Sequence, residues 1–181
     1  EDIEVIEAEL MLADLDAIEK RLFKAEKMVK TGDKKTADEV EFMRRLKEML
    51  AKGEPIRRGA HSEEEQVWLR SYALLSSKPV LYVANVAEGG FENNPYLEAV
   101  RERAATEAAD VVPVCAAIEA EIAQLDEGDR LAFLEELGLH EPGLDRVIRA
   151  AYHLLGLLTF FTAGVKEVRA WQVPKGATAP Q

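Results

Sequence analysis

Two short apolar runs with a helical segment between them restrict the fold of this chain most strongly. The first run, Val80 to Ala84, predicts a buried parallel strand and stops at Asn85. A helix is expected to open near Pro95, and a second apolar strand follows from Val111 to Ala116. Strand, helix and strand in this order form a parallel unit, so both strands end at one edge of the sheet. The sequence therefore predicts an α/β fold with a ligand site outside that edge.

The residues that follow the two strands suit a planar heterocycle. Asn85 offers a donor and an acceptor in one plane, so it can bond an adenine amino group and a ring nitrogen together. The Glu88 carboxylate can accept from an exocyclic amine or from backbone N–H groups. Cys115, Ala116 and Ala117 follow the second strand, and small side chains let the backbone approach a flat base closely. The alternative is that Asn85 only caps a turn, as Asn often does.

The first sixty residues predict two helices that pair antiparallel. A pattern with steps of three and four runs over residues 4–30, and a second helix is expected over residues 34–51, after a break at residues 31–33. The first apolar stripe is close to a coiled-coil seam and comprises Ala8, Leu12, Leu15, Ile18, Leu22, Ala25 and Val29. The second comprises Ala37, Val40, Met43, Leu46 and Leu50. Burying both stripes against each other gives a helical hairpin.

Basic residues gather around the expected tip of this hairpin. They include Lys24, Lys27, Lys30, Lys34 and Lys35. A basic tip on a projecting arm predicts contact with a phosphate backbone such as ribosomal RNA. The alternative is a solvated helix end, where lysines also suit the helix dipole.

Composition excludes several broad classes of protein. The net charge of −11 argues against a surface that is basic throughout, although a local basic patch remains compatible with it. The single Cys115 rules out an intramolecular disulfide and fits a reducing cytosol, so we expect a cytoplasmic protein. No apolar run reaches the length of about 18 residues that a membrane span needs.

No catalytic or metal-ligating constellation is predicted within these residues. The acidic residues Glu119, Glu121, Asp126, Glu127 and Asp129 lack the loop spacing of a calcium site and are expected on a solvated helix surface. The three histidines are far apart and match no metal-binding pattern. No Ser-His-Asp arrangement is indicated either.

The last part of the chain switches from helical to strand patterns. Residues 157–162 and 166–173 predict a β-hairpin around a turn at Gly164, which we interpret as the start of a small β-rich domain. The expected organisation is a helical hairpin over residues 1–60, an α/β portion over 61–157 and an incomplete β-rich domain over 158–181.

Several segments together resemble the Obg-like ATPases, the YchF family of translation-factor-related P-loop GTPases. They are Asn85-Val86-Ala87-Glu88, Phe91-Glu92-Asn93-Asn94-Pro95-Tyr96-Leu97, Val112-Pro113-Val114-Cys115-Ala116-Ala117, Gly143-Leu144-Asp145-Arg146-Val147-Ile148-Arg149 and Thr159-Phe160-Phe161-Thr162-Ala163-Gly164-Val165-Lys166. The resemblance implies the C-terminal part of a P-loop G domain, an inserted coiled-coil arm and the opening of a TGS domain. It also implies a ribosome-associated role.

The resemblance further implies how a nucleotide is read. GTPases of this class use Asn-Lys-x-Asp, whereas this chain has Val86 at the Lys position and Glu88 at the Asp position. Relatives with this change prefer ATP and bind GTP more weakly. The residues implied in base binding are Asn85, Val86, Glu88, Cys115, Ala116 and Ala117.

No Gly-x-x-x-x-Gly-Lys-Ser/Thr motif occurs in the sequence. The phosphate loop and the Mg²⁺ ligands are therefore expected before Glu1, and this chain alone is predicted not to hydrolyse ATP. The leading hypothesis is the base-recognition half of an ATP-hydrolysing protein that acts with the ribosome in translation or stress responses. The alternative is a non-catalytic ribosome- or RNA-interaction module that uses the arm and the TGS domain. A scaffold without a base site is a third reading.

Overall fold

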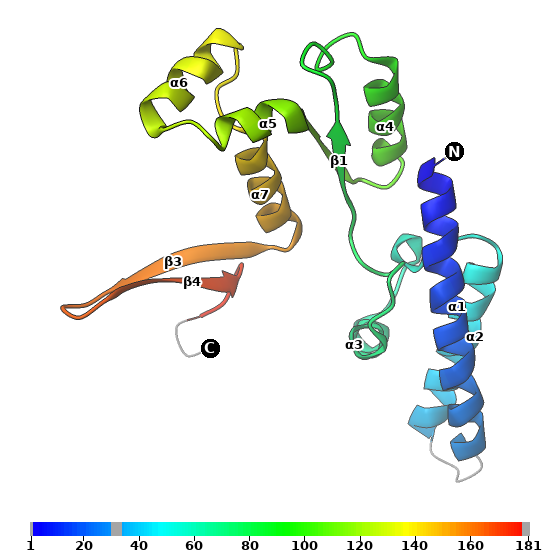
Figure 1. Ribbon diagram of the computed structural model, residues 1–181. Coiled ribbons are helices and arrows are strands. Elements are labelled where there is room, and N and C mark those ends of the chain that lie inside the picture. The colour runs from blue at the N-terminus through cyan, green and yellow to red at the C-terminus, as the bar shows by residue number, and fades with distance from the viewer. Residues whose placement is uncertain (1, 30–33, 179–181) are drawn as a thin grey trace. The chain divides into compact units, whose positions relative to one another are not determined.

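The computed structural model describes residues 2–29 and 34–178 and divides the chain into two compact units, Glu1–Pro79 and Val80–Gln181 (Figure 1). The first unit is helical, and the second contains both strand pairs. This division falls later than the boundary expected near residue 60. The reason is that helix α3 (Glu63–Tyr72) packs against the second helix of the hairpin.

The first unit is built on two long helices, α1 (Asp2–Val29) and α2 (Lys34–Ala51). The bounds of α2 agree with the prediction, whereas the predicted break at residues 31–33 lies outside the described residues. Ion pairs fix the helix directions, since Glu26 of α1 meets Arg44 at 2.6 Å and Glu19 meets Lys47 at 2.8 Å. The α1 residue with the lower number pairs with the α2 residue with the higher number, so the two helices are antiparallel.

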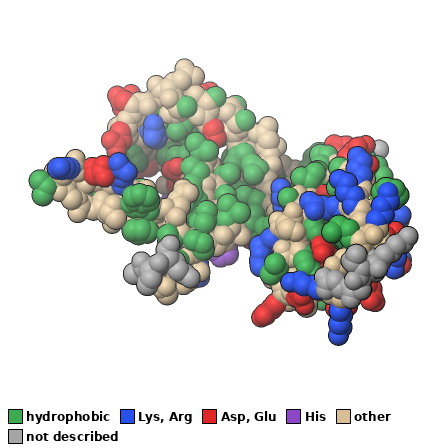
Figure 2. All heavy atoms as spheres, turned by 90° about the horizontal axis from the view of Figure 1, so that it is seen from below, with side chains coloured by type: hydrophobic (Ala, Val, Ile, Leu, Met, Phe, Trp, Pro, Cys, Tyr) green, Lys and Arg blue, Asp and Glu red, His purple; other side chains and the backbone are tan. Residues whose placement is uncertain are grey.

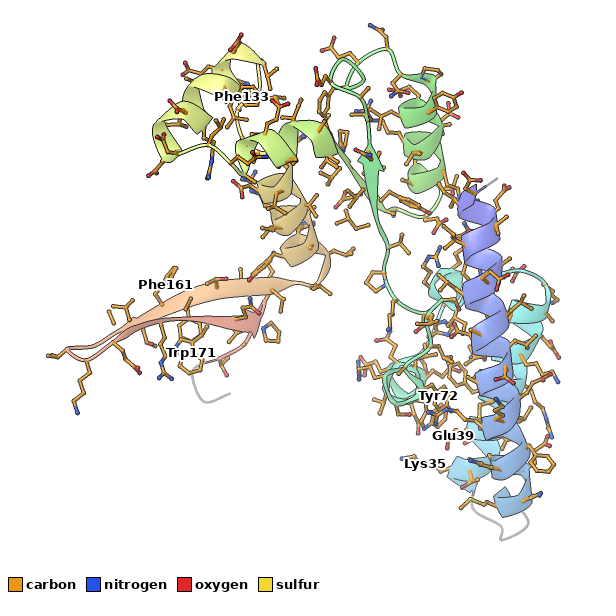
Figure 3. The ribbon with its side chains drawn as sticks, in the orientation of Figure 1. Lys35, Glu39, Tyr72, Phe133, Phe161 and Trp171 are labelled. Atoms are coloured by element: carbon orange, nitrogen blue, oxygen red, sulfur yellow. The ribbon has the colours of Figure 1, made fainter. Side chains whose placement is uncertain are left out.

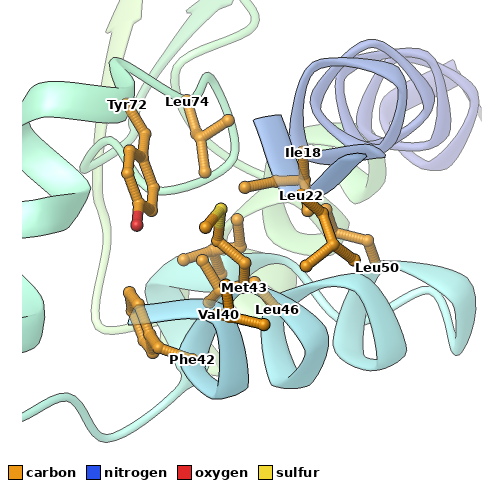
Figure 4. Packing of buried hydrophobic residues seen from close by; sticks show 10 residues of the cluster. Ile18, Leu22, Val40, Phe42, Met43, Leu46, Leu50, Tyr72 and Leu74 are labelled. Atoms are coloured by element: carbon orange, nitrogen blue, oxygen red, sulfur yellow. The ribbon is translucent and has the colours of Figure 1, made fainter. Parts of the chain in front are cut away.

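A single apolar core joins α1, α2 and α3, with Ile18 and Leu46 fully buried at its centre (Figure 4). Two residues of the predicted α1 seam are wrong, because Ala8 is exposed and Leu12 is 60% exposed. A straight helix has 3.6 residues per turn, so a stripe chosen at steps nearer 3.5 rotates away from its partner. Phe42 was missed as a core residue; it is buried because it contacts α3.

The base of the hairpin is fastened by buried polar contacts. Asp14 is only 3% exposed, and its carboxylate accepts from the backbone N–H groups of Leu75 at 2.8 Å and Ser76 at 2.6 Å. The short helix η1 (Ile56–Arg58) joins this arrangement through the Arg57 N–H, which donates to the carbonyl of Ser76 at 3.0 Å. These contacts hold the segment before Pro79 against α1.

Helix α3 begins with the capping box that the sequence contains. The hydroxyl of Ser62 accepts from the N–H of Glu65, and the Glu65 carboxylate accepts from the N–H of Ser62 at 2.8 Å. Burial opposes ionisation of Glu65, but this backbone hydrogen bond and the Arg45 guanidinium outweigh it, so the pKa of Glu65 is lowered.

Over its described residues, 80–178, the second unit contains a parallel strand pair, four further helices and an antiparallel hairpin. The elements are β1 (Leu81–Asn85), α4 (Pro95–Ala105), β2 (Asp110–Val114), α5 (Ala116–Ile122), α6 (Glu127–Glu136), α7 (Gly143–Leu154), β3 (Leu157–Ala163) and β4 (Val168–Pro174). Strands β1 and β2 pair in parallel with Asn85 opposite Val114, as the strand–helix–strand pattern predicts. Helix α5 begins at Ala116, directly after Cys115, which occupies the cap position.

Strand β1 is less buried than its apolar sequence predicts. Val83 is 49% exposed. Among the described residues β2 is the only strand that pairs with β1. The apolar sequence of β1 is typical of a strand inside a larger parallel sheet, but here part of that strand is exposed to solvent.

The terminal hairpin joins β3 and β4 in antiparallel register and carries aromatic side chains on both faces. Trp171 lies opposite Phe160, whereas Phe161 lies on the other face (Figure 3). The indole N–H of Trp171 donates to the hydroxyl of Thr162 at 2.8 Å. Hydrophobic side chains are prominent on the face of this second unit seen in Figure 2.

Candidate functional site

The parallel pairing brings together the two loops singled out in the sequence. The N–H of Val86 donates to the carbonyl of Val114 at 2.8 Å, which extends the ladder one step beyond β1. The N–H of Ala116 then donates to Oδ1 of Asn85 at 3.1 Å. The side chain of Asn85 therefore ties the loop after β1 to the loop after β2.

A cavity of about 450 Å³ lies between these loops. It is lined by Asn85, Val86, Ala87, Glu88, Gly89, Cys115, Ala116 and Ala117. Small-molecule sites have volumes of about 300–1,000 Å³ and combine apolar walls with a few polar groups. All six residues predicted to bind a base thus line one cavity.

The hydrogen bond from Ala116 changes what Asn85 can offer a ligand. Its amide oxygen is engaged, so its NH₂ group is the part that can donate to an acceptor on a base. Adenine and guanine both carry such an acceptor at N7. Asn85 alone therefore suits a purine without choosing between adenine and guanine. With its oxygen engaged, Asn85 does not bond the adenine amine and the ring nitrogen together, as the sequence alone suggests. A second side chain is needed to accept from the amine.

Glu88 is the side chain positioned to supply that second group. It is exposed at the cavity, and no hydrogen bond or ion pair of its carboxylate is found within the described part of the chain. A tight turn follows it, in which the N–H of Gly90 donates to the carbonyl of Ala87 at 2.8 Å. A Cβ on Gly90 would lie 3.1 Å from that carbonyl oxygen, so glycine suits this turn. Asn94 accepts from the first N–H groups of α4 and donates to the Gly90 carbonyl, which fastens the far end of the loop.

The second loop presents backbone and methyl groups. Cys115 is 3% exposed, and it belongs to an apolar cluster with Ile118, Ile122 and Leu134. Its side chain is therefore packed into the protein interior. Ala116 and Ala117 are exposed, so a flat ligand could approach their backbone closely.

The predicted basic surface belongs to the first unit. Lys24 and Lys27 on α1 and Lys34 and Lys35 on α2 are exposed, while Lys30 lies outside the described residues. Figure 2 shows Lys and Arg side chains on this unit interspersed with acidic ones. The ammonium of Lys27 lies over the ring of Phe23, 3.8 Å from its centroid.

Two residues near the cavity were not identified from the sequence. Glu119 was expected on a solvated surface, but it is half-buried and its carboxylate accepts from the N–H groups of Gly143 at 2.6 Å and Leu144 at 3.1 Å. Arg146 donates to the carbonyl of Pro113 at 2.7 Å. These contacts join residues 24 to 33 positions apart, so no local pattern announces them.

The described residues contain no group of three or more His, Cys, Asp or Glu side chains arranged to hold a metal ion. Nor does any helix in the described ranges combine the length and apolar character that crossing a membrane requires.

Comparison with known proteins finds relatives that match the whole of this chain. The ribosome-binding ATPase YchF of Escherichia coli O157:H7 is 54% identical over 181 residues, which are 100% of this chain and 50% of that protein. This chain is therefore similar to YchF proteins over its whole length. The protein of the same name from Bacillus subtilis is 47% identical over 184 residues, again 100% of this chain and 50% of that protein. No protein-family model matches the chain.

A solved structure supports the YchF fold. The YchF GTPase of Schizosaccharomyces pombe matches with a TM-score of 0.88 and 28% identity over 99% of this chain and 50% of that one. The chain thus spans about half the length of the YchF relatives that it matches.

Proposed function

We propose that this chain is the base-recognition half of a protein that binds and hydrolyses ATP and acts with the ribosome in the cytoplasm. The observation that carries the proposal is the cavity between the two loops at the carboxyl ends of β1 and β2, which the Asn85–Ala116 hydrogen bond ties together. Bacterial relatives are named ribosome-binding ATPases, whereas the fission-yeast relative is named a GTPase. The relatives' names thus differ in the purine nucleotide, adenine in one case and guanine in the other.

Charge at Glu88 explains the choice of adenine. Asn85 donates to N7, which every purine has, and the adjacent position carries an amine donor in adenine but a carbonyl acceptor in guanine. An acceptor-only carboxylate attracts the amine and repels the carbonyl. Val86 adds an apolar wall and the backbone of Ala116 and Ala117 adds a flat floor. As the resemblance to P-loop proteins implies, residues of the intact protein outside this chain are proposed to hold the phosphates and Mg²⁺.

Calorimetry on the intact protein tests this account. Asn85→Ala should weaken ATP and GTP binding alike, by about tenfold for a lost hydrogen bond and loop tie of about 1.4 kcal/mol. Glu88→Gln should narrow the preference for ATP, because an amide can donate to the guanine carbonyl. Gln124→Ala, whose side chain bonds within its own helical segment, is the matched control and should change neither affinity. Wild-type protein that holds GTP as tightly as ATP would overturn the proposed pocket.

Hydrolysis by the isolated chain is a separate test. We expect purified residues 1–181 to release no phosphate above background, because phosphoryl transfer depends on groups that bind the phosphates and the metal. Turnover equal to that of the intact protein would contradict this expectation.

A second candidate function is ribosome or RNA contact through the basic surface of the hairpin, with the terminal hairpin as the opening of a TGS domain. Exposed Lys24, Lys27, Lys34 and Lys35 motivate it. Reversing these four charges should reduce co-sedimentation of the intact protein with ribosomes and leave ATP binding unchanged. Reversing Lys52 and Lys78, exposed elsewhere on the same unit, is the matched control. Unchanged sedimentation of the fourfold variant would exclude this surface as the contact.

A further inference from the structure

Helix α7 holds the Cys115–Ala117 loop from both sides, although it does not line the cavity. On the downstream side, α5 begins within the loop and carries Glu119, whose two carboxylate oxygens accept from the first two N–H groups of α7. A carboxylate at a helix N-terminus satisfies free N–H groups and is favoured by the helix dipole. Glu119 therefore caps α7 across a gap of 24 residues.

On the upstream side, Arg146 of α7 holds the end of strand β2. Its Nη2 donates to the carbonyl of Pro113 at 2.7 Å, two residues before Cys115. The guanidinium also lies 5.9 Å from the ring centroid of Phe91, in the loop that follows Glu88. One side chain thus lies beside the segment that precedes the second base loop and the segment that follows the first.

The packing at this point leaves no spare room. A Cβ on Gly143 would lie 2.8 Å from Oε1 of Glu119 and 3.0 Å from Cγ1 of Val114. Glycine here lets α7 approach the end of β2 closely enough for the Glu119 contacts to form.

We infer that Glu119 and Arg146 are positioning residues of the base site, which set affinity for the nucleotide base by holding the Cys115–Ala117 loop against Asn85. The inference rests on the proposed function. Neither residue lines the cavity, so neither is expected to touch the base. They act through the N–H of Ala116, which must stay 3.1 Å from Asn85 Oδ1 to leave the Asn85 NH₂ group fixed as a donor.

Preorganisation gives this arrangement its effect on binding. A loop that is already ordered loses little conformational freedom when the ligand arrives, whereas a loosened loop must be ordered at the expense of affinity. Removing the contacts of either Glu119 or Arg146 should therefore weaken ATP binding by about tenfold, which corresponds to about 1.4 kcal/mol. Groups that hold the triphosphate would be unaffected.

The test compares ligands with and without a base, using the intact protein. Glu119→Gln and Arg146→Met are measured against ATP and against inorganic tripolyphosphate, with Glu121→Gln on α5 and Arg149→Met on α7 as matched controls. We expect the Kd for ATP to rise about tenfold in the two test variants, with the Kd for tripolyphosphate and the kcat at saturating ATP changed by less than about twofold. The controls should match wild type, because Glu121 is exposed and Arg149 forms an exposed pair with Glu141.

Each other outcome is informative. Unchanged ATP affinity in a folded Glu119→Gln variant overturns the inference, and so does an equal loss for ATP and tripolyphosphate, which would mark a general structural role. If Glu119→Gln does not fold, Arg146→Lys keeps the charge but shortens the reach to Pro113 and gives the same readout. Wild-type protein that binds tripolyphosphate but gains nothing from the base would overturn the proposed function itself, and the inference with it.

Discussion

The buried carboxylate of Asp14 gives the sharpest prediction about stability. It is 3% exposed and accepts from two backbone N–H groups, those of Leu75 and Ser76. Asp14→Asn keeps the shape of the side chain but turns an NH₂ group toward one of these donors. One charge-assisted bond becomes neutral, and the other N–H is left buried without an acceptor.

The cost follows from these two losses. Hydrogen bonds to charged groups contribute about 1.5–3 kcal/mol each, and an unsatisfied buried donor costs about 1–3 kcal/mol. Allowing one neutral bond to survive, we expect Asp14→Asn to lower the free energy of unfolding of the first unit by about 2–4 kcal/mol. Asp16→Asn is the matched control on the same helix. Its exposed pair with Lys20 predicts a loss within about 0.5 kcal/mol.

Urea unfolding followed by Trp68 fluorescence measures this cost. The chain has two tryptophans, one in each unit, so a Trp171→Phe background leaves Trp68 as the reporter of the first unit. Trp68 packs against Phe42, with 5.6 Å between ring centroids, and so should respond when the core opens. A loss for Asp14→Asn no larger than that for Asp16→Asn would refute the assignment of the carboxylate as a structural fastening.

Three further predictions use the same fluorescence assay. Leu46→Ala should lower the free energy of unfolding by about 2–5 kcal/mol, because Leu46 is 0% exposed. Leu12→Ala, at a 60% exposed position, should lower it by less than about 0.5 kcal/mol. Equal losses would refute the assignment of the buried face of α1. Burial, and then the hydrogen bond to Glu39, raise the pKa of Tyr72. The neutral Tyr72 side chain therefore contributes fully to stability below about pH 10, and this contribution is lost as the pH rises above that value. Tyr72→Phe should remove the part of the alkaline loss of stability that Tyr72 causes, and an identical loss in the variant would contradict this assignment. Ser62→Ala should cost about 1 kcal/mol through loss of the capping box, and an unchanged urea midpoint would argue against that cap.

Local signals in the sequence were sufficient for much of the fold. Gly53 and Pro55 end the pattern of α2, Ser62 and Glu65 open α3, and Pro95 opens α4. The strand–helix–strand order also predicted that the loop containing Asn85 and the loop containing Ala116 would meet, because parallel strands end on the same edge. The comparison structure and the register of β1 and β2 agree with this α/β arrangement.

Contacts between distant segments could not be predicted in the same way. Glu119 looks like any acid on an amphipathic helix, and only the tertiary structure places the N-terminus of α7 beside it. Likewise, nothing near Leu12 in sequence distinguishes it from Leu15, yet only the latter packs on the core. A rotation of the helix by a fraction of a turn decides between these positions, and packing against α2 and α3 sets that rotation.

The open sheet of the second unit affects how the chain behaves when it is handled alone. Strand β1 pairs only with β2 among the described residues, and Val83 is half exposed. An edge strand of this kind leaves unpaired N–H and C=O groups that can hydrogen-bond to another polypeptide, and burial of the exposed apolar side chains would favour that association. Preparations of residues 1–181 are therefore expected to self-associate as concentration rises, and light scattering across a dilution series should be recorded before any binding result on the fragment is interpreted.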